Sequence, residues 1–239
     1  MQKIQGRIRK AIEEYNMIED GDKVAVGVSG GKDSLTLLVN LAALKRYYPK
    51  KFTLVAITVD MFNGKTDYSE IEKLCKSLDV EYHIVPSQIY EILFEVRKEA
   101  NPCSLCTRMR RGILSETAIK LGCNKLALGH HADDLIETFF LSLFYESRLS
   151  TFLPVTHLDK TGITMIRPMI LIWEKETIEE AKNLPVVFNK CPADKNTQRE
   201  YIKELLKSIA HHIRKVHAHI LSAITHPDRN HLFKNSVDD

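Results

Sequence analysis

The stretch KVAVGVSGGKDSLTLLVNL, residues 23–41, carries the strongest indication of the fold in this chain. Its apolar, β-branched first part predicts a buried strand, and its leucine-rich second part predicts a helix. Two glycines and a lysine separate the two. Such a turn presents bare backbone N–H groups at the positive end of a helix dipole, where anions bind. We therefore expect a phosphate site at this junction.

The segments that follow repeat the alternation of strand and helix. Further strands are predicted at 52–60, 80–86 and 125–130, and helices at 67–79, 88–99, 104–122 and 132–147. Strands that alternate with helices and lack a polar face are typical of a parallel sheet covered on both sides. The expected fold class is α/β, a doubly wound parallel sheet with a small, mostly helical C-terminal extension.

Three parts are expected along the chain: an N-terminal helix at 1–22, the α/β domain at 23–172 and the helical extension at 173–239. Within the domain, residues 155–168 predict a hairpin that turns near 160–162. Within the extension, residues 197–225 predict one long helix.

Composition narrows the class of protein. The chain has 239 residues, 44% of them hydrophobic, which is enough to bury a sizeable core. A formal net charge of +3 permits a nucleic-acid partner without requiring one. The sequence has neither a signal-peptide pattern nor about 18 consecutive apolar residues, so we expect a cytoplasmic protein with no membrane partner. In that compartment cysteines serve as thiols, metal ligands or redox groups, and Cys75 and Cys123, at apolar positions, are expected to be structural.

Other glycine motifs compete with a phosphate loop at this junction. A Walker A loop has four residues between its first glycine and its Gly-Lys pair, and a Ser or Thr after the lysine. Here Gly27 and Gly31 enclose three residues, and Asp33 follows Lys32. The G-x-S-x-G pattern does fit and would make Ser29 a hydrolase nucleophile. That hydrolase fold requires strands ahead of the motif, and only one short predicted helix precedes it. A glycine-rich connection without a ligand is the remaining alternative.

A second polar cluster, GHHADD at 129–134, also follows a predicted strand. Because the carboxyl ends of parallel strands lie at one edge of a sheet, this cluster is expected to face the same cleft as the glycine loop. Asp133 and Asp134 are candidates for Mg²⁺ that carries phosphates, and His130 for a phosphate contact. The alternative is that both aspartates merely favour the dipole of the following helix.

Three cysteines form a separate constellation. Cys103 and Cys106 make a C-x-x-C pair, and Cys191 stands beside a proline. Three thiolates can hold a [4Fe–4S] cube and leave the fourth iron open to sulfide or substrate. Two alternatives remain open: a persulfide that Cys191 resolves as a disulfide, and a zinc site completed by a histidine such as His130 or His131.

Three stretches carry a family resemblance. SGGKDS at 29–34 resembles the pyrophosphate loop of the ATP pyrophosphatases, and 129–134 resembles their second motif. CSLCTRMRRGIL at 103–114, with the later IRPM, EK and C-P…N-x-Q-R elements, resembles the tRNA 2-thiocytidine synthetases. The match runs in order from about Lys23 to Tyr201.

This resemblance implies an ATP-dependent tRNA sulfurtransferase. The enzyme would adenylate a pyrimidine C2 oxygen, in a tRNA cytidine, and replace that oxygen with sulfur. The implied cofactors are ATP, Mg²⁺ and a [4Fe–4S] cluster. The implied partners are tRNA, a sulfur donor such as a cysteine desulfurase or sulfide, and a second copy of the chain. The alternative function is an adenylating tRNA-modifying or amidotransferase-like ligase with structural zinc or with persulfide chemistry.

The same resemblance supplies candidate residues. The catalytic candidates are Lys32, Asp33, Asp133, Cys103 and Cys191. The nucleotide contacts expected are Ser29, Gly30, Gly31, Lys32, Asp33, Ser34, Val59, Gly129 and His130. The cluster ligands expected are Cys103, Cys106 and Cys191, and the Mg²⁺ ligands Asp33 and Asp133. RNA is expected at Arg108, Arg110 and Arg111, which would position the nucleic acid through its phosphates. The alternative is that Arg110 and Arg111 are solvated helix residues paired with Glu116 or Glu99.

Overall fold

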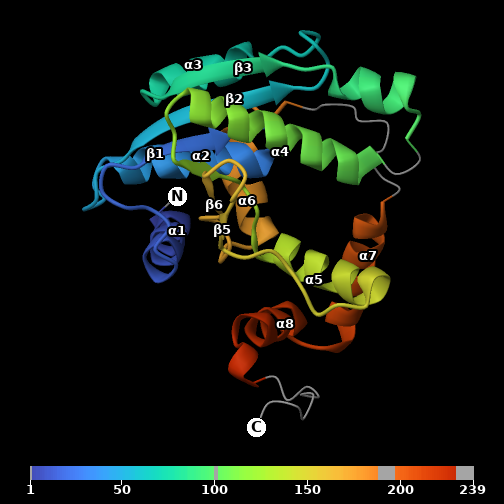
Figure 1. Ribbon diagram of the computed structural model, residues 1–239. Helices are drawn as coiled ribbons and strands as arrows, with labels where there is room; N and C mark the ends of the chain where they lie inside the picture. The colour runs from blue at the N-terminus through green and yellow to red at the C-terminus, as the bar shows by residue number, and fades with distance from the viewer. Residues whose placement is uncertain (1, 100–101, 188–196, 230–239) are drawn as a thin grey trace. The chain divides into compact units, whose positions relative to one another are not determined.

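The structure, a computed structural model, describes residues 2–99, 102–187 and 197–229. Within these residues six strands form one sheet in the order β3-β2-β1-β4-β6-β5 (Figure 1). The strands are β1 (Lys23–Gly27), β2 (Thr53–Asp60), β3 (Glu81–Pro86), β4 (Lys125–Ala127), β5 (Val155–His157) and β6 (Thr164–Ile166). Neighbouring strands are parallel except for the β5–β6 pair, so the predicted α/β class is confirmed.

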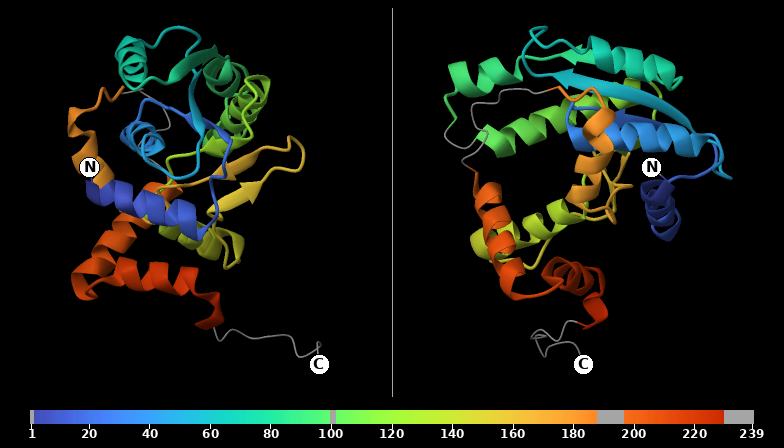
Figure 2. Two further views of the ribbon diagram at one scale, coloured as in Figure 1. Left: turned by 90° about the vertical axis from the view of Figure 1, so that its left-hand side faces the viewer. Right: turned by 180° about the vertical axis from the view of Figure 1, so that it is seen from behind.

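Helices cover both faces of this sheet. The α-helices are α1 (Gln2–Glu14), α2 (Lys32–Lys45), α3 (Ser69–Ser77), α4 (Pro102–Lys120), α5 (Ala132–Glu146), α6 (Glu174–Glu180), α7 (Gln198–His212) and α8 (Val216–Thr225). The shorter turns are the π-helix η1 (Glu91–Val96) and the 3₁₀ turns η2 (Ala181–Asn183) and η3 (Pro227–Arg229). Helix α4 lies on one face of the sheet and α2 on the other, as Figures 1 and 2 show from opposite sides.

The apolar pattern of the sequence explains these layers. On the α4 face, Leu114 and Ala118 of the helix join Ala25 of β1 and Ile57 of β2 in one buried cluster. On the other face, α2 is buried on almost every side because it packs against α1, α6 and the sheet. A helix that is apolar all round is stable only when it is covered in this way. The core therefore fixes both helices that flank the glycine loop.

The order of the strands reverses beside β1. The chain adds β2 and β3 on one side of β1 and then crosses to place β4 on the other. Val26 of β1 pairs with Ala127 of β4, so the loops after these two strands start at the same edge of the sheet. Open α/β sheets bind ligands at this kind of switch point. A Cβ on Gly129 would lie 3.0 Å from the carbonyl oxygen of Asp33, which shows how closely the two loops approach.

The structure corrects two expectations. Residues 197–225 do not form one helix, because the backbone breaks between α7 and α8, where Lys215 adopts a φ of +61°. The third strand is not fully buried, because β3 is an edge strand whose residues are each exposed or half-buried. The predicted hairpin is confirmed: β5 and β6 are antiparallel, and Gly162 at its turn has a φ of +69°.

The chain divides into two compact units. The first unit comprises residues 1–132 and 153–194 and holds the sheet, and the second comprises residues 133–152 and 195–239. The division expected from the sequence, with boundaries at 22 and 172, stays a prediction. None of the helices in the described ranges is both long and apolar enough to cross a lipid bilayer.

Candidate functional site

The phosphate loop, residues 28–34, is held by its own side chains. The Ser34 hydroxyl accepts a hydrogen bond from the Ser29 backbone N–H at 3.1 Å and donates to the Gly31 carbonyl at 2.9 Å. The Gly31 N–H in turn donates to the Ser29 hydroxyl at 3.3 Å. These bonds fix the loop at the start of α2, whose first-turn N–H groups have no intrahelical acceptor. The loop is thereby shaped to receive an anion.

Lys32 lies at the first turn of α2 between two carboxylates. Its Nζ is 2.8 Å from Asp33 Oδ2 and 3.1 Å from Glu174 Oε1 of α6. Burial of the ammonium disfavours its charged form, but the hydrogen bonds and attraction from Asp33 and Glu174 outweigh this, and the pKa of Lys32 is raised. Lys32 is therefore a fixed positive charge at the loop.

Asp33 connects the loop to the rest of its unit. Its Oδ1 accepts a hydrogen bond from the Thr177 hydroxyl of α6 at 2.6 Å. His131, which is buried, places its Nε2 3.8 Å from the same oxygen. Residues from two segments distant in sequence thus converge on one carboxylate beside the phosphate loop.

Gly30 adopts a conformation that glycine alone reaches without strain. Its φ is +85°, and a Cβ at this position would lie 3.1 Å from the Cβ of Val187. The Gly30 carbonyl also accepts a hydrogen bond from the Val187 N–H at 2.9 Å. The segment after α6 is thus joined directly to the loop.

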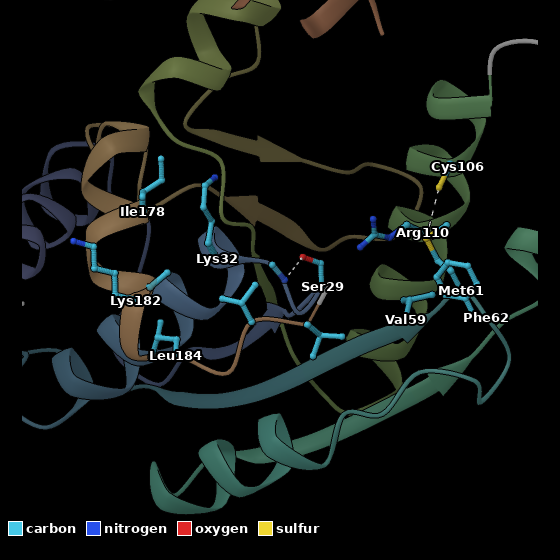
Figure 3. Close-up of a pocket in the computed structure, with 14 residues that line it drawn as sticks. Ser29, Lys32, Val59, Met61, Phe62, Cys106, Arg110, Ile178, Lys182 and Leu184 are labelled. Carbon is cyan, nitrogen blue, oxygen red and sulfur yellow. Dashed lines mark hydrogen bonds between the residues drawn. The ribbon is translucent and has the colours of Figure 1, made fainter. Parts of the chain in front are cut away.

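A pocket of about 720 Å³ opens beside the loop, entirely within the first unit. Its lining residues come from the loop, the end of β2, α4 and the segment around α6: Ser29, Gly31, Lys32, Val59, Met61, Phe62, Cys106, Arg110, Ile178, Ala181, Lys182, Leu184, Val186 and Val187. Figure 3 shows Ser29 and Lys32 on one side of this pocket and Cys106 and Arg110 on another. A volume of this size lies within the range of small-molecule sites.

The structure describes two of the three predicted cluster ligands. Cys106 lines the pocket and places its Sγ 3.9 Å from the Met61 sulfur. Cys103, one helical turn earlier in α4, is exposed. Cys191 lies outside the described residues, and within those residues no group of three or more His, Cys, Asp or Glu side chains is arranged to hold a metal. Two thiols one turn apart at the start of a helix fit the donor chemistry of an iron–sulfur cluster.

The three predicted RNA-binding arginines line two different pockets. Arg110 lines the pocket with Cys106, and its Nε is buried without a hydrogen-bond partner among the described residues. Arg108 and Arg111 line a different pocket. The 100° rotation per residue of a helix explains this, since positions 108 and 111 share a face and position 110 does not.

The other candidates are distributed as follows. Val59, at the end of β2, is buried and lines the pocket. Gly129 packs against the start of α2, and the half-buried His130 follows it in the same loop. Asp133 belongs to the second unit whereas Asp33 belongs to the first, so their joint binding of one Mg²⁺ stays a prediction.

Sequence reasoning did not find roles for Glu174 and Thr177. The dipeptide EK at 174–175 enters the sequence analysis only as one element of the family resemblance, with no role assigned to Glu174. Neither periodicity nor spacing indicates that α6, more than 100 residues away in sequence, contacts Lys32 and Asp33. The contact with Asp33 joins residues 144 positions apart.

Comparisons with known proteins agree with this geometry. The family model described as a PP-loop domain matches residues 1–212. The tRNA-cytidine(32) 2-sulfurtransferase of Citrifermentans bemidjiense is 39% identical over 98% of this chain and 94% of its own length. The enzyme of that name from Pseudomonas paraeruginosa is 41% identical over 85% of this chain and 77% of its own length.

Solved structures extend the comparison to the fold. The U34-tRNA thiolase NcsA of Methanococcus maripaludis, solved with its [4Fe–4S] cluster, has a TM-score of 0.74 at 25% identity. The match covers 95% of this chain and 78% of that one. The NH₃-dependent NAD synthetase of Campylobacter jejuni shares the fold alone, with a TM-score of 0.50 and 15% identity over 98% of each chain.

The shared loop, the shared fold and this level of identity over nearly the whole chain lead to one assignment. The chain belongs to the PP-loop family, and within it to the tRNA-cytidine(32) 2-sulfurtransferases.

Proposed function

We propose that this protein is an ATP-dependent sulfurtransferase that replaces the C2 oxygen of a tRNA cytidine with sulfur. The observation that supports this most is the pocket shared by the phosphate loop and Cys106. In such a reaction the same carbon carries the activated oxygen and is attacked by the sulfur. The phosphate loop and the cysteines that supply the sulfur therefore have to open into one cavity.

The loop end of the pocket is suited to the adenylation step. In that step the C2 oxygen bonds to the α-phosphorus of ATP, and pyrophosphate leaves. The N–H groups at the start of α2 and the ammonium of Lys32 would stabilise the charge that builds on the leaving group. Asp33 is the candidate Mg²⁺ ligand on this unit, with Asp133 as the second.

The α4 end is suited to the sulfur step. Cys103, Cys106 and Cys191 are the proposed ligands of a [4Fe–4S] cluster, which when bound supplies an open iron for sulfide. The sulfide sulfur then bonds to C2, and AMP leaves with the former oxygen. Arg110, in the same pocket, is positioned to hold the negative charge of the adenylate or of the base oxygen. A cysteine desulfurase or free sulfide is the proposed donor, and the proposed assembly is a homodimer.

Nucleoside mass spectrometry tests the proposal. Anaerobically purified, iron-loaded protein is incubated with ATP, Mg²⁺, sulfide and tRNA that lacks thiolation. We expect 2-thiocytidine, AMP and pyrophosphate in equal amounts, and no thiolation when ATP is omitted.

Two outcomes would contradict the proposal. An unchanged nucleoside profile with active, iron-loaded protein would exclude tRNA thiolation. Full activity in a preparation with about one zinc and no iron would support the zinc alternative and exclude the cluster.

A further inference from the structure

A second pocket lies on the other side of α4, against the β5–β6 hairpin. We call it the hairpin cleft; its volume is about 340 Å³. Its polar lining includes Arg108, Arg111, Ser115, His157, Asp159 and Lys160. None of these residues lines the pocket of about 720 Å³ beside the phosphate loop, which we call the reaction pocket. The hairpin cleft is thus a separate site formed by the same helix.

Its basic side chains are exposed and are not neutralised locally. The side chains of Arg108, Arg111 and Lys160 make no ion pair or hydrogen bond with any residue that the structure describes. Arg9, an exposed arginine of α1, by contrast pairs with Glu13 at 2.7 Å. Among the residues that line the hairpin cleft, Asp159 is the one acid. The cleft therefore carries an excess of positive charge.

A buried arginine follows the second strand of the same hairpin, although it does not line the cleft. Arg167, 5% exposed at the end of β6, donates from Nη1 to the Leu153 carbonyl at 2.5 Å and to the Thr156 hydroxyl at 3.1 Å. Burial, with a smaller contribution from the positive charge of Arg111, lowers the pKa of Arg167 to about 10. The positive charge of Arg111 thus disfavours the charged form of Arg167, and an anion bound by Arg111 would offset this effect.

Ser115 supplies a second, independent indication of a ligand. Its side chain lines the cleft, is 2% exposed and has a hydroxyl without a hydrogen-bond partner in the described part of the chain. A buried hydroxyl that makes no hydrogen bond is unfavourable, and structures that retain one often satisfy it with a ligand or water. An oxyanion would provide the acceptor.

We propose that the hairpin cleft binds a backbone phosphate of the tRNA substrate. This inference rests on the proposed function, which supplies the tRNA. Helix α4 would hold the RNA backbone through Arg108 and Arg111 on one side and present Arg110 to the reaction pocket on the other. Phosphate contacts fix the register of an RNA without reading its bases. Such contacts would leave a neighbouring base to be turned out of its stack towards Cys106.

Salt-dependent binding of unmodified tRNA tests the inference. The variants are Arg108→Ala/Arg111→Ala in α4 and, separately, Lys160→Glu in the hairpin, which leaves the helix unchanged. We expect about tenfold weaker binding at low salt, and a slope of log affinity against log salt that is shallower by about one for each phosphate that the variant no longer binds. The controls are Arg46→Ala and Lys120→Ala, which remove exposed charges outside the cleft and should leave both the affinity and the slope unchanged.

ATP binding, measured in parallel, distinguishes a failure of the cleft inference from a failure of the proposed function. Weaker tRNA binding with unchanged ATP binding supports the inference. If the wild type binds tRNA and both cleft variants keep its affinity and slope, the cleft inference is wrong and the proposed function stands. If the wild type binds ATP but no tRNA, both are wrong. If the cleft variants lose binding of an acidic peptide but keep the wild-type binding of tRNA, the site belongs to a protein partner. The inference is again wrong in that case.

Discussion

The two ends of the reaction pocket differ in how their polar groups are held. At the loop end, Ser29, Ser34 and Lys32 are all tied to other groups of the chain, and Lys32 lies between two carboxylates. At the α4 end, Arg110 keeps a buried Nε without a described partner, and Cys103, one helical turn before the pocket-lining Cys106, is exposed. The loop is preorganised by the protein itself, whereas the α4 end offers its groups to a ligand. Substitutions at the two ends should therefore fail in different ways.

The largest effect is expected for Lys32→Ala. Removal of the ammonium takes away a preorganised charge beside the leaving pyrophosphate, and the rate of tRNA-dependent pyrophosphate release should fall about 10²- to 10³-fold. Single-turnover pyrophosphate release is the measurement. Lys73→Ala, which removes an exposed lysine paired with Glu70 on α3, is the matched control and should keep the wild-type rate. A normal rate for Lys32→Ala would contradict the assignment of the loop.

At the other end, Cys106→Ala should remove the cluster and leave nucleotide binding intact. Iron content and visible absorbance are expected to fall several-fold, because two thiolates do not hold a four-iron cluster. The matched control is Cys75→Ala. Cys75 is a buried thiol of α3, and burial raises its pKa to about 11, so this thiol stays protonated. An unchanged iron content in Cys106→Ala would contradict the assignment of Cys106 as a cluster ligand.

Strain at the loop predicts an effect on stability. Gly30→Ala would force a side chain into a positive φ and against Val187, and the free energy of unfolding should fall by about 1–3 kcal/mol. Gly6→Ala is the contrasting variant, since a Cβ in that part of α1 meets no atom within 4 Å. It should raise the free energy of unfolding by about 0.5–1 kcal/mol. Chemical denaturation measures both, and equal effects would show that the loop is not constrained.

The smallest effect is expected for Glu174→Gln. Because the Glu174 carboxylate holds Lys32 at 3.1 Å, its removal frees the ammonium and reduces repulsion of phosphate. ATP should bind about two- to fivefold more tightly at low salt, which corresponds to a modest ion pair. Calorimetric titration measures this. Glu179→Gln, on the same helix but paired with Lys182 at the surface, should not change ATP affinity; weaker ATP binding by Glu174→Gln would reverse the assigned role of Glu174.

Sequence reasoning succeeded where the signal is local. The strand, glycine loop and helix at 23–45 follow from apolar runs and from two adjacent glycines, and the structure has them at those positions. The alternation along the chain was enough to predict the parallel sheet. The 100° helical repeat could also have predicted that position 110 faces away from positions 108 and 111.

It failed where the signal is not local. The end of α7 carries no glycine or proline, the residues that usually mark such a break, and Lys215 takes the left-handed conformation instead. The contacts that α6 makes with Lys32 and Asp33 depend on how the chain returns to the sheet, and no spacing within the sequence encodes that return.

The interleaved units have a consequence for attempts to dissect the protein. Within the second unit, Glu137 of α5 is 2% exposed and meets Arg199 at 2.8 Å and Lys203 at 3.7 Å, both from α7. A fragment that stopped before α7 would retain every described strand, but it would remove both partners of this carboxylate and the buried side chains of Ile202 and Leu206 on the same helix. The last segment of the chain is therefore no detachable tail, and shortened versions should aggregate or be degraded before they reveal anything about catalysis.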